Sequence, residues 1–89
     1  MSLNQAAIED AIKQKLIQIC ETLGEDASDL AHDELIPASG LIDSAGLLEL
    51  LMWYESHFAI PLKPEEITID NLGSIALMAE YVIKRKGQA

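Results

Sequence analysis

The sequence predicts a small all-α domain of three main helices and one short helix, with a long loop between the first and second helices. Three observations support this fold class. The chain has 89 residues, which is room for one hydrophobic core, so we expect a single domain over residues 1–89. Apolar residues recur at spacings of three and four along three separate stretches. Alternation of the β type is confined to a weak case at residues 60–63.

The first helix is expected to begin near Ser2 and to stop at Gly24. Ser2 and Gln5 have the spacing of a capping box, in which two side chains accept hydrogen bonds from each other's backbone N–H groups. Glycine commonly follows a helix, because it adopts the left-handed backbone conformation without strain. The buried face of this helix is predicted to carry Ile8, Ile12, Leu16, Ile19 and Leu23.

Residues 25–43 form a long connection that begins acidic and becomes apolar. We expect its apolar side chains to fold back over the core, with a short helical turn after Ser28. Pro37 and Gly40 prevent a continuous helix through it. Because a connection of this length without its own element is uncommon, it indicates a functional role. The apolar side chains are Leu30, Leu35, Ile36, Leu41 and Ile42.

The second helix is expected over residues 44–58, with Asp43 as its N-cap. Winding the residues at about 100° each separates two faces. The core face carries Leu47, Leu51, Tyr54 and Phe58, with Leu50 beside them. The opposite face carries Ala45, Glu49, Met52 and Ser56, with Trp53 at its margin.

A very short helix and a final helix are expected after Ile60 and Pro61. The run Pro64-Glu65-Glu66 suits a first turn, because proline fits the first helical position and acids favour the positive end of the helix dipole. Asp70 is expected to cap the final helix, at whose C-terminal end cations are favoured. These cations are Lys84, Arg85 and Lys86. The buried stripe is predicted to be Leu72, Ile75, Ala76, Ala79, Val82 and Ile83.

The net charge restricts the classes of partner. Fifteen Asp and Glu against six Lys and Arg give a net charge of −9, and no Lys or Arg lies between Lys15 and Lys63. Such a field repels phosphate backbones and anionic lipid, so we expect neither nucleic-acid binding nor membrane insertion. It favours basic patches on other proteins. Acidic side chains also keep small proteins in solution, which is the plainer interpretation of each one.

Catalysis and metal binding are not predicted. The single cysteine, Cys20, excludes a disulfide framework and the multi-cysteine metal patterns. With no signal-like segment or membrane-length apolar run, we expect a cytoplasmic domain. His32 and His57 have no metal-ligand partner at helical spacing, and residues 26–34 lack the spacing of a calcium loop. No Gly-rich phosphate loop or G-x-S-x-G run is present.

Ser44 is the residue whose setting indicates chemistry. It stands at the start of the second helix, behind Asp43 and after an approach expected to be flexible, Ala38-Ser39-Gly40. Backbone N–H groups and the helix dipole at that position favour a phosphate ester. An Asp-Ser pair at a helix start is also ordinary capping chemistry. The run Gly40-Leu41-Ile42-Asp43-Ser44 before an amphipathic helix, however, resembles the Gly-x-Asp-Ser-Leu attachment motif of the acyl carrier protein family.

The resemblance covers nearly the whole chain, with one helix before the serine and the same helix order after it. The family's Glu at +5, Met at +8 and aromatic residue at +14 from the serine are matched by Glu49, Met52 and Phe58. The segment Ile67-Thr68 leading into Leu72 resembles the family's entry to its last helix.

Two residues depart from the family pattern. Ala45 replaces the usual leucine after the serine, and Gly46 replaces a residue that is often acidic. The second helix also has only Glu49 and Glu55 as carboxylates. The motif lacks the Gly-Gly-Asp-Ser form of many peptidyl carriers. It is closer to discrete carriers, including D-alanyl and aminoacyl carriers, that are served by stand-alone adenylate-forming ligases.

The resemblance implies an acyl-carrier-like bundle that is a carrier and not an enzyme. A phosphopantetheinyl transferase, which itself binds magnesium, would move 4'-phosphopantetheine from coenzyme A to the Oγ of Ser44, with Asp43 as motif residue and helix cap. The thiol of this arm would hold an acyl or aminoacyl thioester in fatty-acid or secondary-metabolite biosynthesis. The implied partners are a loading ligase and downstream transferases with basic docking patches, and the natural form is a monomer.

The residues expected to contact partners lie beside this serine. They are Ala45, Leu48, Glu49 and Met52, with Trp53 and Ser56 at the edge. Glu49 and Glu55 are expected to meet Lys or Arg of a partner. A second interpretation places the Trp53 ring against the long loop. The core-facing side chains of the second helix would also line a groove for a short acyl chain. Two further hypotheses are an acidic helical adaptor without an arm and a carrier-like domain that has lost its modification.

Overall fold

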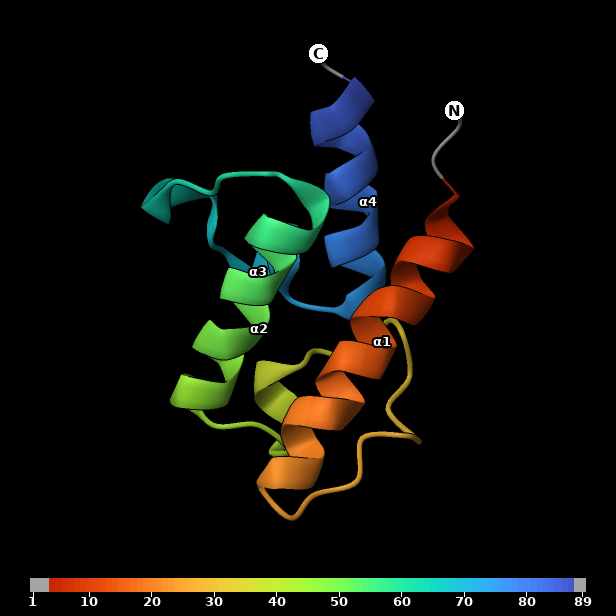
Figure 1. Cartoon of the computed structure of the whole chain (residues 1–89), viewed down its shortest axis with the longest axis vertical. Coiled ribbons are helices and arrows are strands. Elements are labelled where there is room, and N and C mark those ends of the chain that lie inside the picture. The colour runs from red at the N-terminus through yellow and green to blue at the C-terminus, as the bar shows by residue number, and fades with distance from the viewer. Residues whose placement is uncertain (1–3, 88–89) are drawn as a thin grey trace.

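The computed structural model describes residues 4–87, and this part of the chain is helical without a strand. Its elements in order are α1 (Gln5–Thr22), a 3₁₀ turn (Pro37–Ser39), α2 (Ser44–Phe58), a second 3₁₀ turn (Pro64–Glu66), α3 (Ile69–Leu72) and α4 (Ile75–Gly87). The predicted all-α bundle of three main helices and one short helix is confirmed, as is the long loop before α2 (Figure 1). No helix in the described range is long and apolar enough to cross a membrane.

The start of α1 differs from the predicted capping box. Asn4 is the N-cap, and its side-chain oxygen accepts the backbone N–H of Ala6 at 2.9 Å. Gln5 is instead the first helical residue and donates its side-chain amide to Glu9 at 2.9 Å. The predicted cap, Ser2, lies outside the described residues. Asparagine is as good an N-cap as serine. Asn4 therefore supplies the cap, and the helix begins at the next residue, Gln5.

The core lies between α1, α2 and α4, and α3 packs against α4. Every predicted apolar position of α1 is buried except Leu23, which is exposed because the helix has already ended at Thr22. On α2 the buried residues are Gly46, Leu50, Leu51 and Tyr54, whereas Leu47 and Phe58 are only half-buried at the edge of the core. The buried residues of α4 are Ile75, Met78, Ala79, Tyr81 and Val82.

The prediction that Asp70 caps a single final helix is wrong. Thr68 caps the short helix α3, because its Oγ1 accepts the backbone N–H of Asn71 at 3.1 Å. Ser74, just before α4 begins, accepts the backbone N–H of Leu77 through its Oγ at 3.1 Å. Asp70 lies exposed in the first turn of α3. Two capping side chains therefore divide the stretch into two helices, and each begins where its cap supplies an acceptor.

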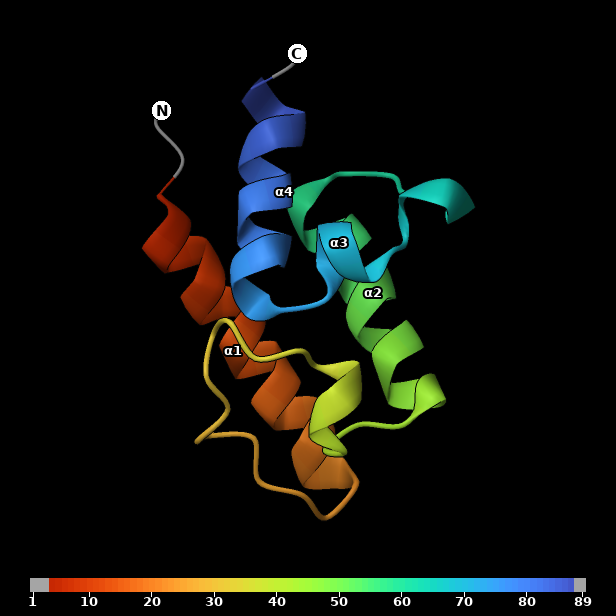
Figure 2. The ribbon, with the colours of Figure 1, turned by 180° about the vertical axis from the view of Figure 1, so that it is seen from behind.

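The long loop lies along α1 and is fastened at several points (Figure 2). The buried amine of Lys13 donates to the backbone carbonyl of Leu30. Further along, the N–H of Ile36 donates to the carbonyl of Gly73 at 2.8 Å, and the backbone N–H of Ala76 donates to the backbone carbonyl of His32 at 2.8 Å. A side-chain hydrogen bond from α1 and backbone hydrogen bonds to the end of α3 and to α4 hold the loop against the bundle.

Most of the expectations for this loop are confirmed. Leu30 and Ile36 are buried, as predicted, whereas Leu35 is exposed. After Ser28 there is a hydrogen-bonded turn without a helix. The helical turn of the loop comes later, at Pro37–Ser39, where proline fits the first position.

Candidate functional site

Ser44 is the first residue of α2 and is exposed. Asp43 precedes it in an extended conformation, and its Oδ1 accepts the backbone N–H of Gly46 at 2.7 Å. Asp43 therefore caps the helix, as the sequence predicted. Since the aspartate supplies the capping acceptor, the Ser44 hydroxyl is not required for that role and stands at an accessible helix end.

The approach to Ser44 is ordered by hydrogen bonds and is not the flexible segment that was expected. Within the 3₁₀ turn, the hydroxyl of Ser39 donates to the carbonyl of Ile36 at 2.6 Å and accepts the N–H of Leu41 at 3.2 Å. Gly40 then adopts a left-handed conformation with φ of 75°, which favours glycine. This glycine turns the chain from the 3₁₀ turn toward the start of α2.

Gly46 is buried because two isoleucines approach it closely. A Cβ atom at this position would lie 2.8 Å from Ile42 Cγ1 and 3.3 Å from Ile19 Cγ2. The glycine that departs from the family pattern thus allows the approach segment and α1 to pack against the first turn of α2. This packing fixes the position of the helix end that bears Ser44.

The electrostatics at this helix end suit an anion. The helix α2 has 15 residues, and its first turn contains no acidic side chain. Its unpaired N–H groups and the positive end of its dipole therefore face the position of Ser44. The nearest carboxylate in sequence is that of Asp43. The residues present fit a phosphate ester on the Ser44 hydroxyl.

The predicted contact residues form an exposed strip on α2. Leu48 is 59% exposed and Met52 63% exposed, which is unusual for large apolar side chains. Ala45 and Glu49 are exposed beside them, whereas Glu55 is half-buried. We call Ala45, Leu48, Glu49 and Met52 the α2 strip. It extends from the residue after Ser44 for two turns of the helix.

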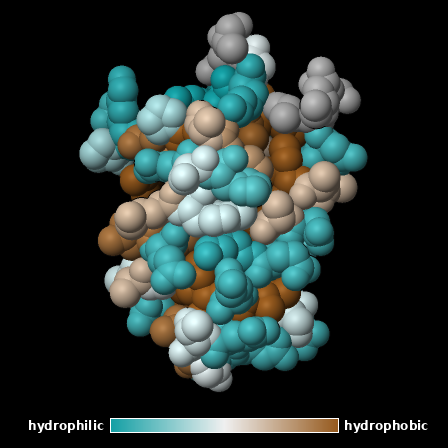
Figure 3. All heavy atoms as spheres, viewed as in Figure 1, coloured by the Kyte–Doolittle hydropathy of each residue, from teal (hydrophilic) through white to brown (hydrophobic). Residues whose placement is uncertain are grey.

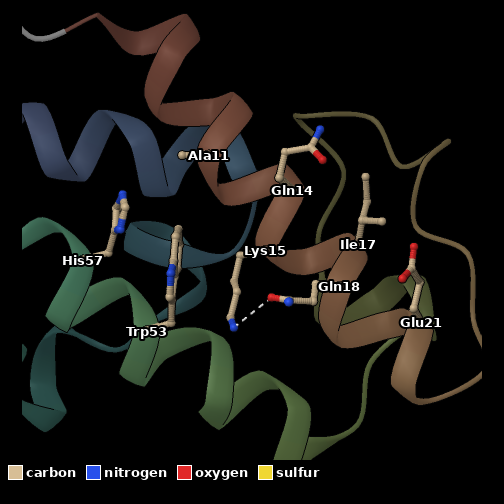
Figure 4. A pocket seen from close by; sticks show the side chains of 8 residues that line it. All are labelled: Ala11, Gln14, Lys15, Ile17, Gln18, Glu21, Trp53 and His57. Atoms are coloured by element: carbon tan, nitrogen blue, oxygen red, sulfur yellow. Dashed lines mark hydrogen bonds between the residues drawn. The ribbon is translucent and has the colours of Figure 1, made fainter.

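Trp53 does not belong to this strip. Its half-buried ring faces α1 across an open pocket of about 490 Å³ and stacks on His57, with ring centroids 4.7 Å apart (Figure 4). The α1 wall of this pocket includes Lys15 and Gln18, which hydrogen-bond each other at 3.1 Å. The ring therefore faces α1 instead of the long loop, and a part for Trp53 in partner contact stays a prediction. A residue at the margin of a helical wheel turns toward whichever neighbour is close enough to cover it.

The surface over α1 and α2 is largely polar. Figure 3 shows hydrophilic residues over much of this face, with hydrophobic ones visible between them. The α1–α2 pocket has a mixed lining, in which polar side chains such as Gln14 and Glu21 stand beside Ile17 and Trp53.

A smaller apolar pocket lies between α2 and α3. It has a volume of about 140 Å³ and is lined by Pro37, Leu47, Leu51, Ile67, Thr68, Ile69, Leu72 and Gly73. Leu47 and Leu51 were predicted to line such a groove. Tyr54 and Phe58 were also predicted there, but neither lines this pocket. Tyr54 is fully buried and donates its hydroxyl to the Met78 carbonyl at 2.8 Å.

Two apolar residues of this region were missed by the sequence reasoning. Ile67 is 44% exposed and Ile69 is 57% exposed, and both line the small pocket. They flank the Thr68 cap and belong to no helical stripe. Two β-branched apolar residues in that position were the available signal, because a short connection offers them no core face.

The other reactive side chains lie away from Ser44. Cys20 is fully buried, and burial followed by the charge of Glu25 raises the pKa of its thiol. His32 Nδ1 lies 2.5 Å from Glu9 Oε1, which joins the long loop to α1. Within residues 4–87 no cluster of three His, Cys, Asp or Glu residues has the geometry of a metal site.

Comparisons with known proteins bear on this serine-bearing helix. The family model described as "Phosphopantetheine attachment site" matches residues 15–82, a range that contains Ser44 and the whole of α2. A D-alanyl carrier protein of Leuconostoc citreum (strain KM20) is 39% identical over 61 residues, which cover 67% of this chain and 77% of that protein. No solved structure matches.

Proposed function

Because the chain belongs to the family of phosphopantetheine-bearing carrier proteins, we propose that Ser44 is the residue to which its arm is attached. The protein is a carrier and not an enzyme, and its cofactor is covalently bound 4'-phosphopantetheine. The observation that supports Ser44 most directly is its position: an exposed hydroxyl at the start of α2, next to an aspartate that already caps the helix.

In the attachment reaction the carrier supplies the nucleophilic hydroxyl and the helix end that bears it, and the transferase supplies the catalytic groups. In the step that a phosphopantetheinyl transferase catalyses, the Ser44 Oγ attacks the phosphorus of coenzyme A that bears the pantetheine. A new phosphorus–oxygen bond forms to the serine, the bond to adenosine 3',5'-bisphosphate breaks, and the serine proton passes to a base of the transferase. Asp43 keeps the first turn of α2 formed, and the helix N-terminus stabilises the phosphodiester charge. The arm supplies a terminal thiol that holds the cargo as a thioester.

The test of this assignment is intact mass after incubation with coenzyme A, magnesium and a broad-specificity phosphopantetheinyl transferase. We expect the wild-type chain to gain one phosphopantetheine and Ser44→Ala to gain none while it remains folded. Ser28→Ala, which changes an exposed serine of the long loop outside the predicted contact surface, is the matched control and should be modified normally. A folded wild-type chain without the mass gain would favour an unmodified helical adaptor, and a gain in Ser44→Ala would move the site elsewhere.

We further propose that the cargo is an aminoacyl group of the D-alanyl type, within the broader class of acyl and aminoacyl thioesters. The similarity to a D-alanyl carrier protein supports this assignment. The small size of the α2–α3 pocket is in keeping with a compact cargo. The loading partner would be a stand-alone ligase that activates the amino acid with ATP, releases AMP and transfers the aminoacyl group to the thiol of the arm.

Loading is tested with the modified protein, ATP and a D-alanine-activating ligase. Addition of one alanyl group from D-alanine, reversed by hydroxylamine, is the expected result. L-Alanine at the same concentration serves as the stereochemical control. Efficient loading by a fatty-acyl or malonyl transferase, without loading by the D-alanine ligase, would contradict the aminoacyl assignment and leave the carrier role in place.

The α2 strip is proposed as the surface that partners recognise. Its exposed Leu48 and Met52 provide apolar contacts, and Glu49 provides a charge for basic docking patches. The partners are the phosphopantetheinyl transferase, the loading ligase and a downstream acyltransferase. We also propose that the carrier acts as a monomer in the cytoplasm, where its one free cysteine, Cys20, would stay reduced.

A further inference from the structure

The connection between α2 and α3, residues 59–68, forms one wall of the small apolar pocket. It leaves the end of α2 close to α4, swings outward and returns to α3 (Figure 1). Ile60 near its start is buried, and the 3₁₀ turn Pro64–Glu66 lies in its outer part. Three of the residues that line the pocket, Ile67, Thr68 and Ile69, follow that turn directly. The position of the turn therefore determines the position of this wall.

Glu66 fastens the turn to α4. Its Oε1 accepts hydrogen bonds from the hydroxyl of Tyr81 and from Nη1 of Arg85. Arg85 also donates through Nη2 to the carbonyl of Pro61 at 3.3 Å, and its guanidinium lies 5.9 Å from the centre of the Tyr81 ring. We call Glu66, Tyr81 and Arg85 the Glu66 clasp. The clasp joins residues that are 15 and 19 positions apart in sequence and holds the outer loop against α4.

The same carboxylate also shapes its own turn. Glu66 Oε2 accepts the backbone N–H of Lys63 at 2.7 Å, and the Glu66 carbonyl accepts from the Asn71 side chain at 3.0 Å. The Lys63 N–H and the Tyr81 hydroxyl lower the pKa of Glu66, so the carboxylate is ionised at neutral pH. Charged hydrogen bonds of this kind are stronger than neutral ones.

The residue after Glu66 lines the pocket. Ile67 contributes to its wall together with Leu47 and Leu51 of α2. The Ile67 N–H donates to the Pro64 carbonyl at 3.2 Å, and the next N–H donates to the Glu66 carbonyl at 3.0 Å. These bonds make the turn and Ile67 a single local unit. Displacement of the Glu66 carboxylate must therefore displace the Ile67 side of the pocket.

We propose that Glu66 is a positioning residue that sets the largest acyl group the α2–α3 pocket admits. The proposal rests on the function proposed above, because the group in question would be carried on the arm of Ser44. With the clasp closed, the pocket measures about 140 Å³. That is well below the roughly 300–1,000 Å³ of pockets that enclose drug-sized ligands, so it suits a small acyl group. A longer chain enters only if Ile67 moves outward, and the clasp opposes this movement.

The first test measures the clasp in the unmodified protein. Glu66→Gln places an amide NH₂ opposite backbone or side-chain donors, and Tyr81→Phe removes one donor while keeping the ring. We expect backbone amide exchange over residues 60–68 to become at least about fivefold faster in both variants, with exchange in α1 unchanged. The matched control is Glu65→Gln, which alters an exposed carboxylate in the same turn. Equal exchange in Glu66→Gln and Glu65→Gln would overturn the proposal.

The second test measures the size limit on the loaded arm. The transferase is used to attach butyryl and octanoyl arms from the corresponding coenzyme A thioesters, and their cleavage by hydroxylamine is timed. We expect the ratio of octanoyl to butyryl cleavage rates to fall at least about twofold in Glu66→Gln and Tyr81→Phe. The longer chain would then be better sheltered than in the wild type. The ratio should stay unchanged in Glu65→Gln.

The two readouts separate the possible failures. A general loss of stability would change both thioesters alike, so an unchanged ratio in the clasp variants would overturn the proposal even if exchange became faster. Absence of any arm on Ser44 would contradict the proposed function, whereas unchanged amide exchange would contradict the clasp itself.

Discussion

Asp43 and Ser44 are adjacent but have separate tasks. Asp43 accepts the Gly46 N–H at 2.7 Å and begins the helix, and Ser44 presents the hydroxyl. We expect Asp43→Ala to lower the free energy of unfolding by about 1 kcal/mol, the usual effect of removing an N-cap. Urea denaturation measures this change. Asp43→Asn should keep most of the wild-type stability, because an amide oxygen also caps a helix. If Asp43→Ala were as stable as the wild type, the cap would not be needed.

Glu49 is the charged residue of the α2 strip, one turn beyond Ser44. We expect Glu49→Lys to slow the encounter with the loading ligase several-fold at low salt, because it reverses the charge that meets a basic patch. Stopped-flow association kinetics measure the effect. The control is Glu65→Lys, the same charge change at an exposed position of the outer loop. Identical kinetics for the Glu49 variant and the wild type would remove this residue from the recognition surface.

Cys20 provides an internal reference for the thiol of the arm. Its thiol is buried, and burial raises its pKa, so less of it is thiolate at any given pH than for a free cysteine. Titration of the folded protein with a disulfide reagent at pH 8 should show no fast-reacting thiol before modification and one afterwards. Rapid reaction of the unmodified chain would contradict the burial of Cys20. Full reaction in denaturant gives the total count.

At the scale of elements, the first turn of α2 depends on the close packing of Gly46 against Ile42 and α1. Alanine would normally favour a helix, but here its Cβ would lie 2.8 Å from Ile42 Cγ1. We therefore expect Gly46→Ala to destabilise the fold by roughly 1–3 kcal/mol, as overpacking does. Thermal unfolding followed by circular dichroism measures this loss.

A control for Gly46→Ala is available at the end of α4. Gly87→Ala adds a Cβ with nothing within 4 Å, so it should leave stability nearly unchanged. Ile42→Ala alone destabilises the fold by leaving a cavity. In that background the added effect of Gly46→Ala should be smaller than in the wild type, because the clash with Ile42 Cγ1 is gone. A stabilising effect of Gly46→Ala alone would show that Ile42 gives way easily.

The parts of the fold that the sequence predicted are those with a strong local signal. The stripe of α1, the Asp43 cap and the 3₁₀ turn at Pro64 each depend on residues close together in the chain. The division between α3 and α4 was missed because Thr68 and Ser74 compete as caps with Asp70. All three are good capping residues, and only the packing of Leu72 and Ile75 decides among them.

The candidate site shows the same contrast. Ser44 was found from its motif and helix position, which are local. The α2 wall of the small pocket, Leu47 and Leu51, was also predicted, because both lie on one helix face. The opposite wall and the Glu66 clasp were not, since they join segments that meet only after folding. Trp53 lay at the boundary between two faces of the helical wheel, and its orientation depends on the neighbouring helix α1.

At the scale of the whole molecule, charge is distributed unevenly. The end of α4 and the outer loop lie far from the start of α2 (Figure 1). They carry four of the positive side chains, Lys63, Lys84, Arg85 and Lys86. Between Lys15 and Lys63 there is no Lys or Arg, and the net charge of the chain is −9. The resulting field turns the Ser44 end toward basic surfaces during an encounter. We therefore expect partners to meet the Ser44 end of the molecule first.

The central claim is that the arm is attached to Ser44, and site mapping on the wild-type chain tests it most directly. The protein modified by the transferase is digested, and the peptide that gains the phosphopantetheine mass is fragmented in a mass spectrometer. The fragment ions should place the whole added mass on Ser44 and none on Ser39 or Ser56. Location of the mass on either of those serines, or a folded chain that gains no mass, would contradict the account.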